Sequence, residues 1–107
     1  MNTVKAPFLR DTALRYGVVQ MEVLLTFSGQ VKVSPGAFQL FKASDGTVQP
    51  VSIRVENVNG YSIVHIAASP LLYMRRVPLK VTLDGTLITD KNGVALPELT
   101  PEVAVTF

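Results

Sequence analysis

The chain contains no cysteine and no tryptophan, and it has a single histidine among its 107 residues. Without cysteine, disulfide bonds, thiol nucleophiles and thiolate metal ligands are all excluded. The lone histidine, His65, has no second histidine with which to complete an imidazole metal set. Charge is also scarce, because only 17% of the residues are charged, with ten Lys and Arg against eight Asp and Glu. Arg75-Arg76 is the one adjacent basic pair, so the sequence lacks the basic stripe typical of nucleic-acid binding, and we expect no nucleic-acid partner.

Long hydrophobic runs are missing too. No window approaches the roughly 18 uncharged apolar residues that form a membrane helix, so we expect no membrane insertion. Apolar residues nowhere recur at helical spacing over three turns, which argues against a long helix. With 48% hydrophobic residues the chain is nevertheless typical of one globular domain. We assign residues 14–107 to that domain and residues 1–13 to an approach segment or linker, in which residues 4–9 can add a short edge strand.

The clearest local signal is Asn59-Gly60, which joins two apolar-alternating arms within residues 47–68. Both central residues of a type I′ turn need positive φ, and these two residue types tolerate it best. A two-residue loop fixes the register of the whole hairpin. The expected pairs are Val58 with Tyr61, Asn57 with Ser62, Glu56 with Ile63, Val55 with Val64, Arg54 with His65, and Ile53 with Ile66.

This register divides the hairpin into two faces, since alternate residues of a strand point to opposite sides. The face expected to lie on the core carries Ile53, Val55, Val64 and Ile66. The face expected to meet solvent carries Arg54, Glu56, Ile63 and His65. We therefore interpret His65 as an ordinary surface histidine without a catalytic role.

Further strands follow from alternation and from turn residues. In residues 18–28 the odd positions from Val19 to Phe27 are expected to face the core. Shorter strands are expected at residues 31–33, 37–43, 79–83, 86–89 and 103–107, separated by Gly, Pro, Asp and Asn turns. About seven short strands with turns every ten residues or so predict an all-β fold, an antiparallel β-sandwich.

The acidic turns near the end of the chain are the only candidate metal ligands. Asp84, Asp90 and Asn92 carry oxygen ligands beside glycines, and calcium takes six to eight oxygens. Only Asp90 and Asn92 are close in sequence, however. We expect Asp90 to cap its own turn and Asn92-Gly93 to adopt left-handed conformations, so we predict no specific calcium site and no cofactor.

Tyr73, Met74, Arg75 and Arg76 form an aromatic, soft and cationic cluster within the least patterned segment. These residue types are enriched at protein interfaces. We predict that the cluster lies in a surface loop, and we keep it as the candidate interaction site.

Three phrases of the sequence resemble bacterial immunoglobulin-like modules, in particular the copies repeated in planctomycete giant proteins and the S-layer type of Ig-like domain. Residues 23–29 resemble the family's "V-x-V-T-F-S" strand, and Arg15 lies where its copies often have an Arg. Residues 35–40 resemble its "G-A-F-x-L" turn and strand, and residues 83–96 resemble its final turns. Two features depart from the pattern: the Tyr73 to Arg76 cluster replaces a glycine-containing loop, and Val94 replaces an Asn.

The resemblance implies that the all-β fold is an antiparallel Ig-like β-sandwich, and it implies a role class and no shared catalytic residues. It implies a non-catalytic structural or adhesion module of a larger exported or cell-surface bacterial protein. Its partners would be neighbouring domains of the same chain or other surface proteins. The alternative is a carbohydrate-binding or accessory domain of a secreted enzyme, which needs coplanar exposed aromatic rings. Because Tyr16, Tyr61 and Tyr73 are far apart in sequence, we rank that alternative second, and an enzyme third.

Overall fold

The computed structural model describes residues 6–105 and 107, which form ten strands and one short helix. The elements are β1 Leu9–Tyr16, β2 Met21–Phe27, β3 Val31–Val33, β4 Phe38–Lys42, β5 Val48–Gln49, β6 Ser52–Val58, β7 Tyr61–Ala68, α1 Pro70–Met74, β8 Leu79–Leu83, β9 Ile88–Asp90 and β10 Glu102–Val105. Seven of these strands have four or more residues, and β3, β5 and β9 are shorter.

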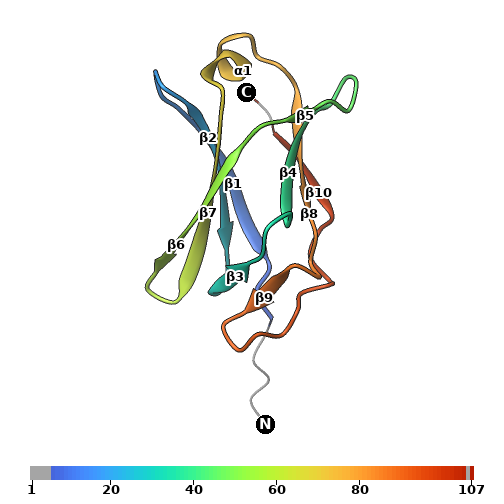
Figure 1. Cartoon of the computed structure of the whole chain (residues 1–107). Helices are drawn as coiled ribbons and strands as arrows, with labels where there is room; N and C mark the ends of the chain where they lie inside the picture. Colours follow the sequence, from blue (N-terminus) through green and yellow to red (C-terminus); the bar gives the residue numbers. More distant parts are fainter. Residues whose placement is uncertain (1–5, 106) are drawn as a thin grey trace.

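Two four-stranded sheets make up the body of the molecule (Figure 1). The first has the order β1-β2-β7-β6 and the second the order β10-β8-β4-β5, while β3 and β9 form a separate two-stranded ribbon. Every strand pair is antiparallel. The predicted fold class, an all-β antiparallel sandwich, is confirmed.

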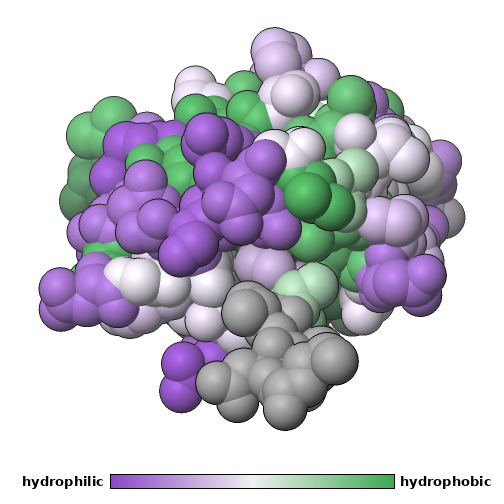
Figure 2. All heavy atoms as spheres, turned by 90° about the horizontal axis from the view of Figure 1, so that it is seen from below, coloured by the Kyte–Doolittle hydropathy of each residue, from purple (hydrophilic) through white to green (hydrophobic). Residues whose placement is uncertain are grey.

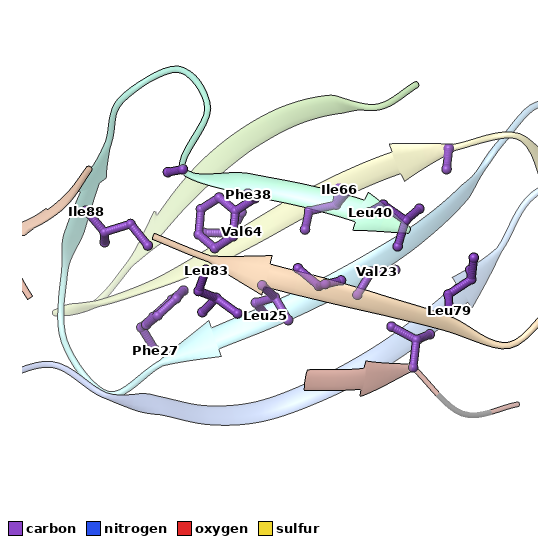
Figure 3. Close-up of a cluster of buried hydrophobic side chains, with 14 of the residues drawn as sticks. Val23, Leu25, Phe27, Phe38, Leu40, Val64, Ile66, Leu79, Leu83 and Ile88 are labelled. Atoms are coloured by element: carbon purple, nitrogen blue, oxygen red, sulfur yellow. The ribbon is translucent and has the colours of Figure 1, made fainter. Parts of the chain in front are cut away.

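The core lies between the sheets and is built by the alternation that the sequence shows. Four alternate residues of β2 are fully buried, namely Met21, Val23, Leu25 and Phe27. Side chains of β4, β7 and β8 meet them from both sheets (Figure 3). The ring of Phe27 packs against that of Phe38, with the ring centroids 6.4 Å apart. Burial of these apolar side chains is the main source of stability.

The strand expected from residue 18 is shorter than predicted at its beginning. Val18 and Val19 are each 87% exposed and lie in the turn between β1 and β2. Gly17 closes this turn by donating its backbone N–H to the carbonyl of Gln20 at 2.9 Å. The expected core position of Val19 is therefore wrong, because β1 pairs with β2 only as far as Tyr16 and Met21.

β1 crosses the expected domain boundary at residue 14, so residues 9–13 belong to the first sheet. The strand lies at the sheet edge and has an irregular register between Leu9 and Asp11. The short strand expected at residues 4–9 lies partly outside the described residues.

All six expected pairs of the β6–β7 hairpin are confirmed. Asn59 has a φ of 42° and Gly60 a φ of 92°, as a turn with two left-handed central residues requires. The core face is confirmed for Val64 and Ile66, which are fully buried. Ile53 is instead 37% exposed.

Replacing Gly60 by Val should lower the free energy of unfolding by on the order of 1–2 kcal/mol or more, because a β-branched residue is strained at positive φ. The ideal Cβ at this position meets no atom within 4 Å, so the effect is conformational and not steric. Urea unfolding measures the change. Asn59→Gly is the control and should leave stability nearly unchanged, since glycine accepts the same φ. An equally stable Gly60→Val variant would contradict the turn.

Candidate functional site

Four charged or ionisable side chains lie on the outer face of the first sheet, one on each strand. Each contacts the side chain on the neighbouring strand. Arg15 comes from β1, Glu22 from β2, His65 from β7 and Glu56 from β6. We call this set the His65 network. It forms because the pairings of β2 with β1, and of β7 with β2 and β6, bring alternate residues onto one face.

The contacts within the His65 network are short. Arg15 donates to Glu22 Oε1 from Nη2 at 2.9 Å and from Nε at 3.2 Å. The imidazole Nε2 of His65 lies 2.8 Å from Glu56 Oε1. Its Nδ1 lies 3.4 Å from Glu22 Oε2, an ion-pair distance, but makes no hydrogen bond among the described residues. The imidazole is thus held between two carboxylates.

The expected solvent exposure of His65 is wrong, because its residue exposure is only 5% and that of Glu22 only 9%. The hairpin register correctly places His65 on the outer face opposite Arg54. It does not show that β7 is an inner strand, in which His65 also pairs with Leu24 of β2. Alternation in β2 predicts that Glu22 and Leu24 lie on the same outer face. The burial of His65 beside them could be predicted only with the pairing of β2 and β7 known as well.

The contacts of the His65 network connect neighbouring strands of the first sheet. A histidine that activates a nucleophile needs a hydroxyl or thiol within hydrogen-bond reach, and the contacts of His65 among the described residues are to carboxylates. A shallow cavity of about 250 Å³ next to it is lined by Arg15, Glu22 and residues 16–20, but His65 does not line it. The arrangement links neighbouring strands by charge and hydrogen bonds.

The acidic residues proposed as weak calcium ligands cap their own turns. Asp84 Oδ1 accepts from the Thr86 hydroxyl at 2.6 Å and from the Thr86 N–H at 3.0 Å. Asp90 Oδ1 accepts from the N–H groups of Asn92 at 2.8 Å and Val94 at 3.0 Å. Left-handed conformations were expected at both Asn92 and Gly93. Gly93 has one, with a φ of 84°, and the expectation is wrong for Asn92.

The turn at Asp84 favours the ionised carboxylate. The side-chain hydrogen bond from Thr86, followed by the backbone one, lowers the pKa of Asp84 below its ordinary value. The same pattern recurs at Asp45, whose pKa is lowered first by the hydroxyl of Thr47 and then by its N–H. A lowered pKa means that these contributions to stability are present at neutral pH and are lost as the pH falls through the lowered values.

No group of three or more His, Cys, Asp or Glu residues suited to a metal ion occurs in residues 6–105 and 107. Across the same part of the chain, no helix has the length and apolar character needed to cross a membrane.

Seen from the end opposite α1, hydrophilic residues cover much of the surface and hydrophobic ones form smaller areas between them (Figure 2).

Melting curves recorded with 10 mM calcium and with chelator should overlay, since one oxygen of each turn carboxylate already accepts two hydrogen bonds. A ligand present at a hundred times its dissociation constant adds about 2.7 kcal/mol, so only a site tighter than about 0.1 mM would shift the curve clearly at that concentration. Differential scanning calorimetry gives the comparison. A rise of several degrees with calcium that disappears in Asp90→Ala would make this turn a metal site.

The predicted surface loop around Tyr73 is in part a short helix, α1. Ser69 caps it by accepting the N–H of Leu71 on its hydroxyl at 3.3 Å, and proline occupies the first turn. Met74 is 61% exposed, and Arg75 and Arg76 are exposed too. Arg76 leaves the helix with a φ of 51°.

Tyr73 is half-buried, because its ring stacks on Tyr16 with centroids 4.7 Å apart and meets the edge of Phe107 at 5.6 Å. The separation of the tyrosines in sequence therefore did not predict their positions in the fold, because β1 and α1 bring two of the three together. Stacking covers the ring faces that the two tyrosines turn toward each other. The candidate interaction residues Tyr73, Met74, Arg75 and Arg76 thus divide into one packing residue and three exposed ones.

No protein-family model, curated protein or solved structure matches this chain. Its role must therefore be argued from its own residues and strand arrangement.

Proposed function

We propose that the chain is a non-catalytic Ig-like module with a structural or adhesive role in a larger exported or cell-surface bacterial protein. The sheet orders β1-β2-β7-β6 and β10-β8-β4-β5 support it. Taken in chain order, the first corresponds to strands A-B-E-D of an immunoglobulin domain, and β4, β8 and β10 of the second correspond to C, F and G. The sequence phrases described above support the bacterial branch of that class.

The observation that carries the proposal is the path of the chain through the sandwich. At one end, Phe8 and Ser28 exchange two hydrogen bonds of 2.9 Å just beyond the end of β2. At the other end, Phe107 packs on Tyr73, whose ring stacks on Tyr16 just before β2 begins. The described chain therefore enters and leaves at opposite ends of the long axis (Figure 1). Modules with this path can be joined end to end.

Tension applied through the two ends runs along the strands. Hydrogen bonds between antiparallel strands are perpendicular to the strand direction, so such tension loads all those between β1 and β2 in shear at once. The His65 network crosses the same sheet and ties β1 to β6 through two inner strands. Both features suit a spacer that carries load.

Single-molecule force spectroscopy tests this role, and the absence of native cysteine allows attachment at two introduced cysteines. One variant is pulled through residues 6 and 107. The control is pulled through residues 6 and 59, which lie at the same end of the first sheet, so the force peels strands apart one bond after another. We expect a clearly higher unfolding force for the first geometry. Equal forces, or a weaker end-to-end geometry, would contradict a load-bearing module.

Carbohydrate binding is the second candidate, and the aromatic group of Tyr16, Tyr73 and Phe107 is the observation that favours it. Tyr16 is 44% exposed and Phe107 41% exposed, so both offer ring surface to a ligand. Stacking of a sugar on these rings would bury apolar area at one end of the sandwich. Glycan-array binding by the native chain that is lost in Tyr16→Ala, with unchanged melting, would place this role first.

A further inference from the structure

The strand β6 is an open edge of the first sheet. It has seven residues, and within residues 6–105 no strand lies beyond it (Figure 1). Natural proteins protect such edges with bulges, prolines, shortness, cover or charged side chains, above all lysine or charges that point inward. The other edges of the described sheets have such protection: β1 has an irregular register, β5 has two residues and is followed by Pro50, and β10 is short and lies beside β1. β6 has no proline, no lysine and no register shift, and its two charged residues, Arg54 and Glu56, lie on the outer face of the sheet.

The hairpin register defines which backbone groups β6 presents outward. Val58 and Tyr61 flank the two-residue turn and form a hydrogen-bonded pair, and such pairs alternate along an antiparallel ladder. The N–H and C=O groups of Ile53, Val55 and Asn57 therefore point away from β7. They form a regular row of three donors and three acceptors along the edge.

We infer that β6 pairs with β6 of a second copy of this chain, antiparallel about a two-fold axis at Val55. This register places Val55 opposite Val55 of the other copy and Ile53 opposite its Asn57. Those are the residues whose backbone groups point outward, so each forms a hydrogen-bonded pair. The two first sheets then become one continuous sheet of eight strands, and both open edges are removed.

The charges of β6 are complementary to themselves in that register. Arg54 and Glu56 are both exposed and lie one on each side of Val55, so each Arg54 faces Glu56 of the other copy. These are non-hydrogen-bonded positions, where cross-strand side chains are closest. Glu56 already holds His65 at 2.8 Å. Pairing would extend the His65 network across the two-fold axis into both copies.

An apolar groove beside the edge favours the same partner. Ile53 and Val55 line a groove of about 220 Å³ together with residues 33–36, which include Val33 and Pro35. Both side chains lie on the inner face of β6 and are partly uncovered. In the paired arrangement the grooves of the two copies flank the two-fold axis, so association buries the exposed part of Ile53 twice.

Sedimentation equilibrium between about 1 µM and about 1 mM tests the inference on the native chain, a range that covers free energies of association typical of weak dimers. We expect a monomer–dimer equilibrium that weakens with added salt. Arg54→Glu puts two like-charged pairs across the axis and should raise the dimer dissociation constant roughly tenfold or more. Arg75→Glu, the same change at the exposed residue that follows α1, is the control and should have no effect.

A mixing experiment identifies the register. The Arg54→Glu chain carries two acidic residues at positions 54 and 56, and the Glu56→Arg chain carries two basic ones. Each alone should remain monomeric, whereas an equimolar mixture should form a heterodimer, because every facing pair is then of opposite sign. Circular dichroism melting of each variant confirms that it is folded. Hydrogen exchange should show that Ile53, Val55 and Asn57 amides gain protection as the native chain is concentrated.

A native chain that stays monomeric to about 1 mM overturns the inference. So does a dimer that ignores Arg54→Glu, or a mixture of the two charge variants without a heterodimer. An edge that instead captures an extended segment of another protein, with no self-association, overturns it as well. The inference does not depend on the load-bearing role, since association between copies and resistance to end-to-end tension are measured separately.

Discussion

Gly85→Ala should abolish the fold or cost about 4 kcal/mol or more of unfolding free energy, the range reached by few single substitutions. An ideal Cβ at this position would overlap the carbonyl oxygen of Leu96 and would lie 2.8 Å from its carbonyl carbon. The Gly85 carbonyl in turn accepts the Leu96 N–H at 2.9 Å. Two backbone segments therefore meet here without room for a methyl group, and Leu96 is itself buried.

The matched control is Gly46→Ala. Gly46 has a φ of 72°, and its ideal Cβ meets no atom within 4 Å. Its substitution should cost about 1–2 kcal/mol, from the left-handed backbone alone. Thermal and urea unfolding of both variants separate steric exclusion at Gly85 from conformational strain at Gly46. Equal losses in the two would show that the segment around Leu96 moves aside.

Phe27→Ala should lower the free energy of unfolding by about 3–5 kcal/mol, since a large buried ring is replaced by a cavity that its neighbours fill only in part. Phe27 is fully buried at the end of β2, and Phe38 contacts its ring from the other sheet. With a loss of this size, a domain of ordinary stability is left with little margin.

Phe41→Ala is the control for Phe27→Ala. Phe41 lies on β4 but points to the outer side and is half-buried, so less apolar area and no closed cavity are at stake. Its loss of stability should be clearly the smaller of the two by urea unfolding. The reverse order would place the core on the wrong face of β4.

Local chemistry accounts for what the sequence could predict. Asn59-Gly60 and a period of two were enough to determine the six pairs of the hairpin, because the turn and the alternation act within a few residues. The fully buried odd positions of β2 follow from the same alternation. Val19 does not follow this alternation because it lies in the turn of the β1–β2 hairpin. That turn has no distinctive residue pair, so it is hard to predict from the sequence.

The candidate site depends instead on contacts between distant residues. Arg15, Glu22, Glu56 and His65 come from four strands, and three separate pairings must be known before they meet. The packing of Tyr16 on Tyr73 likewise needs the relative position of β1 and α1. The need for glycine at position 85 could not be predicted either. Asp84-Gly85 is a dipeptide common in turns, and Gly85 does not have a positive φ, so the sequence does not indicate that the backbone of Leu96 lies beside it.

The stacked tyrosines also give the molecule a built-in optical reporter. Because the chain has no tryptophan, its near-ultraviolet fluorescence comes from three tyrosines alone. Tyr16 and Tyr73 share one environment beside α1, while Tyr61 stands next to the turn of the β6–β7 hairpin at the other end. Emission from Tyr61 and from the stacked pair therefore reports on opposite ends of the sandwich. A Tyr61→Phe chain would leave a signal from the α1 end only, and fraying there could be followed without any attached dye.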